Sequence, residues 1–337
     1  MEKETSGELS ISKNTSDLII VGAGISGLMA SDYLHHHDIR PLILDKSPGV
    51  GGRMATRRIG EARFDHGAQE FICKDSVFCE YLASWLEDGL VHKWFNGERD
   101  HYVGSQGMTA VPKFLAEKQN IVNKCRVMTA DYREDHWIVT CADGREFRSK
   151  LLVLSAPVPQ SLAVLSNIET ELDSRIIKSL REIEYNRCIA VMAVLDQGSR
   201  IGRTGWIRFE NGSIRWIADN QSKSISSTGS VTIHSTCSYA HEHWEDNTDD
   251  IARDLLKIAA DIIGAKPLEY QVHRWRYSDV AVHHPDRLVY SSAPGPVLFC
   301  GDAFGKASCG VETAALSGLS TAEYSLELLR KYDSLTA

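Results

Sequence analysis

The sequence predicts an α/β fold in which a Rossmann-like dinucleotide-binding domain is joined to a second domain of mixed sheet and helices. An apolar run over residues 18–21 precedes a glycine-rich turn over residues 22–27, which opens a helix-like stretch. Near the other end, an apolar strand over residues 297–300 runs into a second glycine turn at 301–302. With 337 residues, 43% of them hydrophobic, the chain is long enough for about two domains.

The first turn has the spacing of a dinucleotide fingerprint, and we expect Gly22, Gly24, Ile25, Ser26 and Gly27 to contact the cofactor. Gly22 permits a tight turn, Gly24 lets the backbone approach a pyrophosphate, and Gly27 lets the helix pack on the sheet. The helix N-terminus then faces the phosphates. An ordinary βα turn could carry the same glycines, but the strand, helix and a downstream acid together favour a binding site.

That acid is Asp45, which follows a second predicted strand over residues 41–44 and is expected to bind a ribose hydroxyl. The loop after it contains Lys46, Gly52 and Arg53, which we predict as further cofactor contacts, with Arg53 offered to phosphate. An NAD domain has no need of this loop, so the pattern favours FAD. A flexible surface turn with a solvated arginine is the alternative.

The C-terminal glycine turn predicts a flavin contact. Asp302 would accept a hydrogen bond from the ribityl chain, and a helix starting near Gly310 and Val311 would point its N-terminus at the flavin edge that becomes negative on reduction. Cys309 lies in the same loop, but we expect the FAD to be bound non-covalently. Small residues at 314–318 fit close approach to the cofactor or to a neighbouring helix equally well.

Together these motifs resemble the renalase-like branch of the FAD-dependent amine oxidase superfamily, over nearly the whole chain beyond the first sixteen residues. The segments that carry the resemblance are GAGISG (22–27), LDKSPGVGGRM (44–54), FDHGAQEF (64–71), GMTAVPKFLA (107–116), HRWRY (273–277) and CGDAFGKASCGVETAALSG (300–318). The first two are shared by the wider superfamily. The resemblance implies an FAD-binding domain of glutathione-reductase type with an accessory β-meander and an amine-oxidase-like substrate domain.

The resemblance also implies an activity and more site residues. Gly67, Ala68 and Gln69 would contact the cofactor, and Val127 would flank the adenine through its backbone. The reaction would be transfer of a hydride from a small substrate to flavin N5, with reoxidation by O2 to H2O2. The family's donors are isomeric dihydronicotinamide dinucleotides, so NAD(P) would be the substrate and FAD the cofactor.

Two positions depart from the branch. Glu70 stands where a tyrosine is usual, and Ala303, followed by Phe304, stands where an aromatic residue is usual. An acid in a flavin pocket would favour a cationic substrate or alter the redox balance, whereas an acid facing solvent or paired with an arginine would do neither.

The substrate side offers several pocket candidates but no assigned catalytic residue, because a flavin needs few indispensable side chains. Strand alternation places His273, Trp275 and Tyr277 on one side and two arginines on the other, so an aromatic face could grip a flat substrate. Core packing is the alternative, and for His234 the two interpretations are level. The candidates are Gln69, Glu70, His234, Trp275 and Tyr277.

Two competing functions stay open from the sequence. An amine oxidase or dehydrogenase acting on an organic amine would suit an aromatic cage and Glu70. A non-catalytic FAD-binding redox sensor would explain the departures at Glu70 and Ala303 as a decayed pocket. Reduction of the flavin by amines, or by no small donor, distinguishes them from the renalase-like function.

The predicted domains are discontinuous. Residues 1–16 are expected to be a disordered extension, residues 17–75, 104–157 and 292–333 the FAD-binding domain, and residues 76–103 and 158–291 the substrate domain. Eight cysteines without a CxxC pair predict reduced thiols, and the histidines form no metal-ligand pattern.

Charge and hydropathy narrow the partners and location. A formal net charge of −8 and no basic tract argue against nucleic acid. The N-terminus lacks the apolar core of a signal peptide and no apolar run could span a bilayer, so we expect a cytoplasmic protein without membrane contact. No sequence pattern predicts an oligomeric state.

Overall fold

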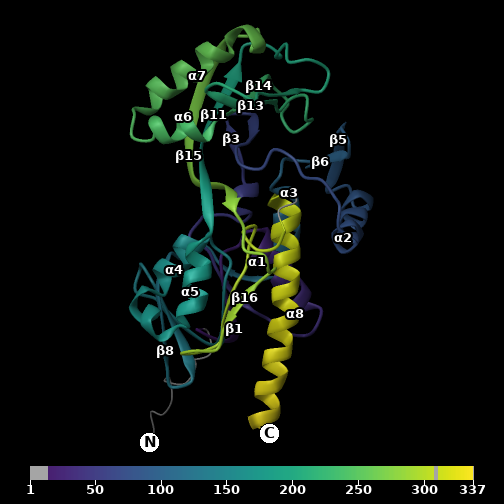
Figure 1. Ribbon diagram of the computed structural model, residues 1–337. Helices are drawn as coiled ribbons and strands as arrows, with labels where there is room; N and C mark the ends of the chain where they lie inside the picture. The colour runs from purple at the N-terminus through teal and green to yellow at the C-terminus, as the bar shows by residue number, and fades with distance from the viewer. Residues whose placement is uncertain (1–13, 307–309, 337) are drawn as a thin grey trace, which may run out of the picture.

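The computed structural model describes residues 14–306 and 310–336, and its first sheet is the predicted Rossmann-like sheet (Figure 1). Its strand order is β16-β17-β10-β1-β2-β7, with β10, β1, β2, β7 and β17 parallel and β16 antiparallel to β17. The strands are β1 (Thr15–Val21), β2 (Leu42–Leu44), β7 (Asn120–Val122), β10 (Glu146–Leu154), β16 (Val289–Ser291) and β17 (Val297–Phe299). Because β1 already begins at Thr15, the last residues of the expected disordered extension are ordered, while 1–13 lie outside the described residues.

One face of this sheet is covered by α1 (Ile25–His35), α3 (Ala110–Ala116) and the long C-terminal α8 (Gly310–Thr336). The approach of α8 to α1 is very close, because a Cβ added at Gly318 would lie 2.2 Å from the carbonyl oxygen of Ser26. The small residues at 314–318 therefore serve helix packing at Gly318.

The predicted β-meander is present on the other side of β10. The strands β8 (Val127–Arg133) and β9 (His136–Cys141) form a hairpin, and β9 pairs antiparallel with the first half of β10, whose second half joins the parallel sheet. The helices α4 (Val158–Val164), η2 (Ser166–Glu171) and α5 (Ser174–Arg181) pack in the same core as Trp137 and Phe147. Residues 158–183, which we expected in the substrate domain, thus pack with the first sheet.

The second sheet is antiparallel, in the order β12-β13-β14-β11-β15, and lies with α6 and α7 at the top of Figure 1. One face, which includes Ile189 and Ile233, packs on α7, and the other carries Met192, which contacts Ile59 and Phe64 from the first half of the chain. The elements are β11 (Glu184–Leu195), β12 (Trp206–Arg208), β13 (Ile214–Asp219), β14 (Ser230–Ser235), β15 (Pro267–Val282), α6 (Cys237–Glu242) and α7 (Thr248–Ile263).

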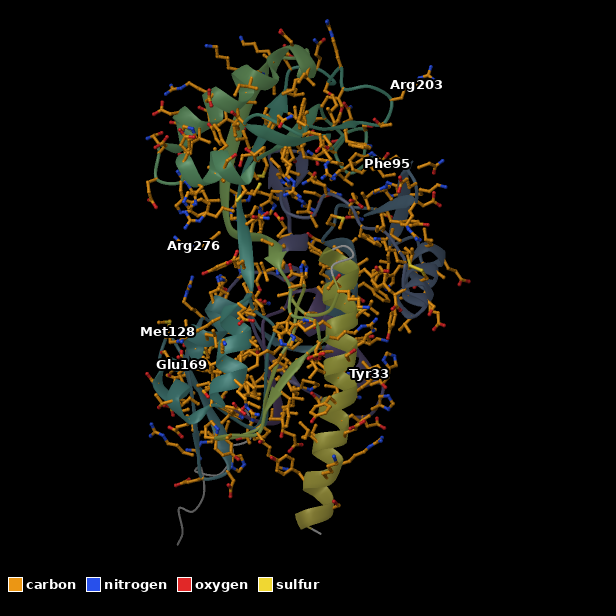
Figure 2. The ribbon with its side chains drawn as sticks, viewed as in Figure 1. Tyr33, Phe95, Met128, Glu169, Arg203 and Arg276 are labelled. Atoms are coloured by element: carbon orange, nitrogen blue, oxygen red, sulfur yellow. A yellow bond between two sulfur atoms is a disulfide. The ribbon has the colours of Figure 1, made fainter. Side chains whose placement is uncertain are left out.

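Short elements connect the two halves. After the glycine loop come η1 (Gly52–Met54) and the hairpin of β3 (Thr56–Ile59) with β4 (Ala62–Asp65). The helix α2 (Ser76–Glu87) packs in the core of α1 and α8. The strands β5 (Val91–Asn96) and β6 (Asp100–Gly104) form a hairpin that carries Phe95, which is labelled in Figure 2. This hairpin reaches the second sheet, because the centroids of the Phe95 and Trp206 rings lie 4.8 Å apart. Residues 76–103, expected in the substrate domain, therefore contact both halves.

The cysteine expectation is wrong for four residues. Cys73 is disulfide-bonded to Cys79, and Cys125 to Cys141, with Cα separations of 5.7 and 6.0 Å. The spacing of these cysteines does not reveal the two bonds, because the partners meet only through the turn into α2 and through the pairing of β8 with β9.

Every helix among residues 14–306 and 310–336 is too short or too polar to cross a membrane.

Candidate functional site

The turn after β1 is shaped by glycines that no larger residue could replace. Gly22 has φ +114°, and a Cβ there would lie 2.6 Å from the Ser155 Oγ. A Cβ at Gly27 would lie 2.2 Å from the carbonyl oxygen of Gly22, so α1 starts directly against the end of β1. The tight turn and the close helix packing are both as the sequence predicts.

The start of α1 fits a pyrophosphate. Gly24 is the N-cap residue, no side chain caps the helix, and a Cβ at Gly24 would meet nothing within 4 Å. The neighbouring Ile25 and Ser26 form the first turn, which contains no acid. Backbone N–H groups at a helix start with no side-chain cap, beside open space at Gly24, form an anion cradle that a Cβ would obstruct, so these residues fit the phosphates of a dinucleotide.

The second glycine loop lies against this cradle. Gly51 donates its N–H to the Ala23 carbonyl at 2.8 Å and forms a bridge with Gly24. Gly52 has φ +54°, and its Cβ position is 3.6 Å from the Gly24 Cα. Two loops nearly thirty residues apart thus form one backbone surface for an extended cofactor.

Asp45 follows β2 beside the same turn. Its carboxylate accepts hydrogen bonds from the backbone N–H groups of Ala23 and Ser47, both at 2.7 Å, and its carbonyl accepts one from Cys125 N at 2.8 Å. The last bond brings the chain that enters β8 at Val127 alongside Asp45. Lys46 lies at the edge, where its Nζ donates to the Gln160 side chain at 3.2 Å. The ribose and adenine contacts of these residues stay predictions.

The predicted phosphate and ribityl residues bind each other. The Arg53 guanidinium makes two bonds of 2.6 Å to the two carboxylate oxygens of Asp302. The same Nη1 approaches the carbonyls of Tyr277 and Ser278 at 3.3 and 3.4 Å. A planar, doubly bonded Arg–carboxylate pair is rigid, so it fixes the C-terminal loop relative to the glycine loop and β15.

The loop after β4 packs under the glycine loop. A Cβ at Gly67 would lie 2.1 Å from the Arg53 carbonyl oxygen, which accepts a bond from Ala68 N at 2.8 Å. At the start of α8, Gly310 is exposed and Val311 is buried, and Glu312 in its first turn accepts bonds from the N–H groups after Cys73. Cys309 lies outside the described residues.

A cluster of histidines and a tryptophan lies on the face of the second sheet that carries Met192. The Trp275 ring stacks on His66 at 5.2 Å, and its Nε1 donates to the His66 carbonyl at 2.7 Å. His273 meets both rings edge-on, at 4.3 and 5.0 Å. His234 Nε2 lies 3.0 Å from the same carbonyl, which makes it the donor there. We call His66, His234, His273 and Trp275 the imidazole–indole face.

The sheet register produces this face. His234 and His273 are both paired with Ala190 of β11, so the three side chains share one side of the sheet. Arg276 points to the other side, 5.7 Å from the Trp244 ring, as the strand alternation predicts. Tyr277 does not join the face but meets Tyr185 at 5.4 Å.

All three imidazoles are neutral near pH 7. Burial, and then His273, lower the pKa of His66 to about 3. Burial lowers the pKa of His234 to about 4, and burial followed by Arg57 lowers the pKa of His273 to about 4. The imidazole–indole face therefore carries no charge in the physiological range.

Glu70 is paired, though with a histidine and not an arginine. Its Oε2 lies 3.0 Å from His101 Nδ1, and both side chains are about one quarter exposed. The His101 ring stacks on the Phe95 ring, with centroids 4.1 Å apart. Phe95 in turn contacts the Trp206 ring, which is stacked on Trp216. Ala303 and Phe304 are both buried, so the departure there leaves an aromatic ring in the core, one position later.

Four residues at the site were not singled out from the sequence: His66, Asp65, His101 and Lys223. His66 and Asp65 lie within the FDHGAQEF segment, which signalled the loop but not these side chains. No sequence pattern indicates His101 or Lys223, because His101 reaches the site from the β5–β6 hairpin and Lys223 from the loop between β13 and β14.

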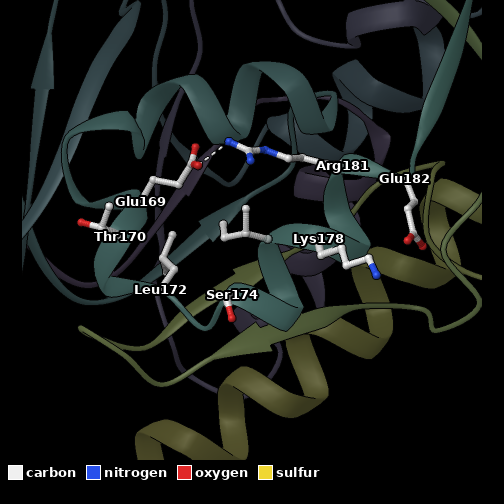
Figure 3. A pocket seen from close by; sticks show the side chains of 8 residues that line it. Glu169, Thr170, Leu172, Ser174, Lys178, Arg181 and Glu182 are labelled. Atoms are coloured by element: carbon white, nitrogen blue, oxygen red, sulfur yellow. Dashed lines mark hydrogen bonds and ion pairs between the residues drawn. The ribbon is translucent and has the colours of Figure 1, made fainter.

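A separate surface pocket of about 490 Å³ lies between η2 and α5 (Figure 3). Leu172 and Ile177 line it, and the Arg181 guanidinium is ion-paired with Glu169 across it. None of the predicted site residues borders this pocket.

The chain is similar to two protein families and to a known relative. Residues 20–84 match the NAD(P)-binding Rossmann-like domain, and residues 89–325 match the flavin containing amine oxidoreductase family. Renalase from Mus musculus is 26% identical over 321 residues, which cover 85% of this chain and 92% of that protein.

Two solved structures share the fold. A putative protoporphyrinogen oxidase from Exiguobacterium superposes with a TM-score of 0.70 at 13% identity, over 94% of this chain and 99% of that one. Putrescine oxidase bound to putrescine superposes with a TM-score of 0.71 at 14% identity, over 93% of this chain and 99% of that one.

Proposed function

The chain belongs to the flavin containing amine oxidoreductase family and is an FAD-dependent oxidoreductase, and from this premise we propose that its substrate is a dihydropyridine, an isomer of a reduced nicotinamide dinucleotide. The similarity to renalase, over 85% of this chain and 92% of that protein, supports the renalase-like branch, whose resemblance implies this class of donor. The putrescine oxidase likeness, at 14% identity, supports the fold alone.

The imidazole–indole face is the observation that carries the proposal. It is aromatic and uncharged, because burial keeps its three imidazoles neutral. Within it the Trp275 and His66 rings are stacked, and His273 stands edge-on to both. A flat, uncharged ring such as a dihydropyridine stacks well on such a face. The Trp275 bond to the His66 carbonyl holds the indole at a fixed angle beside the loop that contains Gln69.

The carboxylates near this face favour the same donor over an organic amine. Glu70 is paired with His101, Asp302 with Arg53, and Asp65 accepts bonds from Thr56 Oγ1 and Met108 N. A protonated amine would have to compete with the Arg53 guanidinium for Asp302, and Asp65 is fully buried. A neutral donor needs no counter-ion.

Bound FAD would accept the hydride from the substrate's C–H bond and would then pass the electrons on to O2. The residues of this chain have the remaining tasks. The α1 cradle and the loops around Gly51 hold the dinucleotide, the imidazole–indole face orients the substrate ring, and the Arg53–Asp302 pair fixes the loop leading to α8. These assignments of site residues are part of the proposal.

The test is peroxide formation in air by the purified, FAD-loaded protein. Each donor is supplied alone: the common reduced nicotinamide dinucleotide, a preparation enriched in its ring isomers, and a panel of amines that includes putrescine. We expect peroxide with the isomers and none above background with the amines. Peroxide formed from an amine alone would replace the proposal with an amine oxidase function.

A further inference from the structure

Lys223 is buried completely although it carries a basic group. Its side chain is 0% exposed, and it lies in the loop between β13 and β14. Its own backbone is held in place, because its N–H donates to the Asp219 carbonyl and its carbonyl meets His92 Nε2 at 3.0 Å. Burial of an ammonium group is strongly unfavourable unless partners surround it.

Three groups surround the Lys223 amine. It donates to Gln69 Oε1 at 2.9 Å, lies 3.6 Å from Asp65 Oδ2, and sits 4.7 Å from the centroid of the Trp94 ring. Asp65 is the last residue of β4, Gln69 lies in the loop after it, and Trp94 lies on β5. Lys223, from the loop between β13 and β14, thus bonds to Gln69 in the loop that contains the predicted cofactor contacts.

The bond to Lys223 decides the orientation of Gln69. Because the carboxamide oxygen faces the amine, the nitrogen faces the other way, where it donates to the Asp65 carbonyl at 2.6 Å and the Gly67 carbonyl at 3.2 Å. Both ends of the carboxamide are therefore fixed. Among the described residues, Lys223 is the one donor to the Gln69 oxygen, so this oxygen would be left without a donor if the amine were removed.

We propose that Lys223 is a positioning residue of the flavin site, which holds Gln69 and, through it and Asp65, the loop over residues 65–70. The inference rests on the proposed function, because it is the FAD site that this loop would border. A purely stabilising role is a poor explanation, since replacing a buried ion pair by apolar residues is often neutral or stabilising. A buried lysine bonded to a predicted cofactor contact is better explained by the site it borders.

The geometry also makes the site sensitive to pH. Burial lowers the pKa of Lys223 to about 8, against the opposing effect of the Asp65 and Glu70 charges. The other titratable groups facing this region are His92 on β5, His101 on β6 and the neutral His234 on β14. Loss of the proton near pH 8 removes a positive charge beside the Gln69 carboxamide.

The experiment is a pH titration of the visible absorbance of the bound oxidised flavin, in the FAD-loaded protein without substrate. We expect a spectral transition with a midpoint near pH 8 that disappears in Lys223→Met. Lys93→Met is the matched control, because Lys93 is exposed on β5 and paired with Asp100, and it should keep the transition. A transition that persists in Lys223→Met, or that the unmodified protein lacks, would overturn the proposal.

Gln69→Glu gives an independent test that does not depend on Lys223→Met folding. A carboxylate at this position would favour the charged amine, so the midpoint should rise by about one pH unit or more. An unchanged midpoint would contradict the proposal.

Flavin reduction should also slow in Lys223→Met by about tenfold, as expected for a small misplacement of groups at the reacting centre. Failure of every donor to reduce the flavin would overturn the proposed function alone, since the spectral titration needs only bound FAD.

Discussion

Arg53 and Asp302, which are 249 positions apart in the chain, form a two-bond ion pair in which both N···O distances are 2.6 Å. The pair joins the glycine loop after β2 to the loop that leads into α8. Each residue was predicted as a separate cofactor contact. Their pairing means that the two loops bordering the predicted FAD site are held as one unit.

Replacing Asp302 should weaken FAD retention. In Asp302→Asn, the Arg53 guanidinium keeps a neutral partner in a largely buried position, so the two loops lose their strongest connection. We expect the Kd for FAD to rise by roughly tenfold or more, which corresponds to about 1.4 kcal/mol.

The measurement is flavin content after purification, together with titration of the apoprotein with FAD. Asp250→Asn is the control, because Asp250 forms an exposed pair with Arg253 on α7, which packs on the second sheet. Equal FAD affinity in Asp302→Asn and the unmodified protein would remove the pair from the account.

Replacing Gly318 should destabilise the fold. A methyl group at this position in α8 would overlap the Ser26 carbonyl of α1, at 2.2 Å, so the helices would have to separate. Overpacking of this kind costs about 1–3 kcal/mol, which outweighs the better helix propensity of alanine.

We expect Gly318→Ala to show a lower midpoint in chemical denaturation, and Glu323→Ala, on an exposed position of the same helix, to change little. If both variants were as stable as the unmodified protein, the close contact of α1 with α8 would be wrong.

Trp275→Phe separates substrate orientation from cofactor binding. The change keeps an aromatic ring but removes the Nε1 donor that holds the His66 carbonyl. We expect normal FAD content and flavin reduction slowed by about tenfold, because the ring that orients the substrate is no longer fixed.

Trp244→Phe is the matched control, since Trp244 lies near Arg187 and Arg276 on the opposite side of the sheet. The measurement is the stopped-flow rate of flavin reduction in both variants. Equal rates in Trp275→Phe and Trp244→Phe would show that Trp275 serves packing alone.

Acid should destabilise the fold through three histidines. His66, His234 and His273 have folded pKa values of about 3, 4 and 4, below the ordinary 6.5. Between about pH 4 and pH 6.5, the unfolded chain therefore binds up to three more protons than the folded chain. The contribution of these histidines to the free energy of unfolding is fully present above pH 6.5 and is lost as the pH falls. His66 and His234 should together give a slope of up to about 3 kcal/mol per pH unit, to which the half-buried His273 adds up to about 1 kcal/mol per pH unit because solvent screens it.

His273→Phe should reduce this slope by up to about 1 kcal/mol per pH unit, whereas His37→Gln, an exposed position, should leave it unchanged. Denaturation midpoints at several pH values between 4 and 7 measure the effect. A slope that His273→Phe does not alter would show that this imidazole is not buried as described.

The local elements of the FAD-binding half could be predicted from the sequence. Gly22 and Gly27 signalled their turn because a positive φ and a close backbone contact leave no alternative residue. The alternation in β15 correctly placed Trp275 opposite Arg276. Such features depend on neighbours in the chain, which the sequence displays directly.

Contacts between distant segments were not predictable in the same way. Glu70 meets His101 across a hairpin, and Lys223 reaches Gln69 from another sheet. Residues 158–183 follow a predicted FAD-domain strand, and only the packed core shows that they return to that sheet. The disulfides of Cys73 and Cys125 likewise depend on proximity that spacing alone does not reveal.

Isomeric dihydronicotinamide dinucleotides should reduce the flavin of this protein. The direct measurement is anaerobic mixing of the FAD-loaded protein with a reduced nicotinamide preparation enriched in ring isomers, while the visible absorbance of the flavin is followed. We expect rapid bleaching in proportion to the isomer supplied, and none with the common reduced form or with putrescine. Flavin that stays oxidised with the isomers, or that bleaches only with an amine, would contradict it.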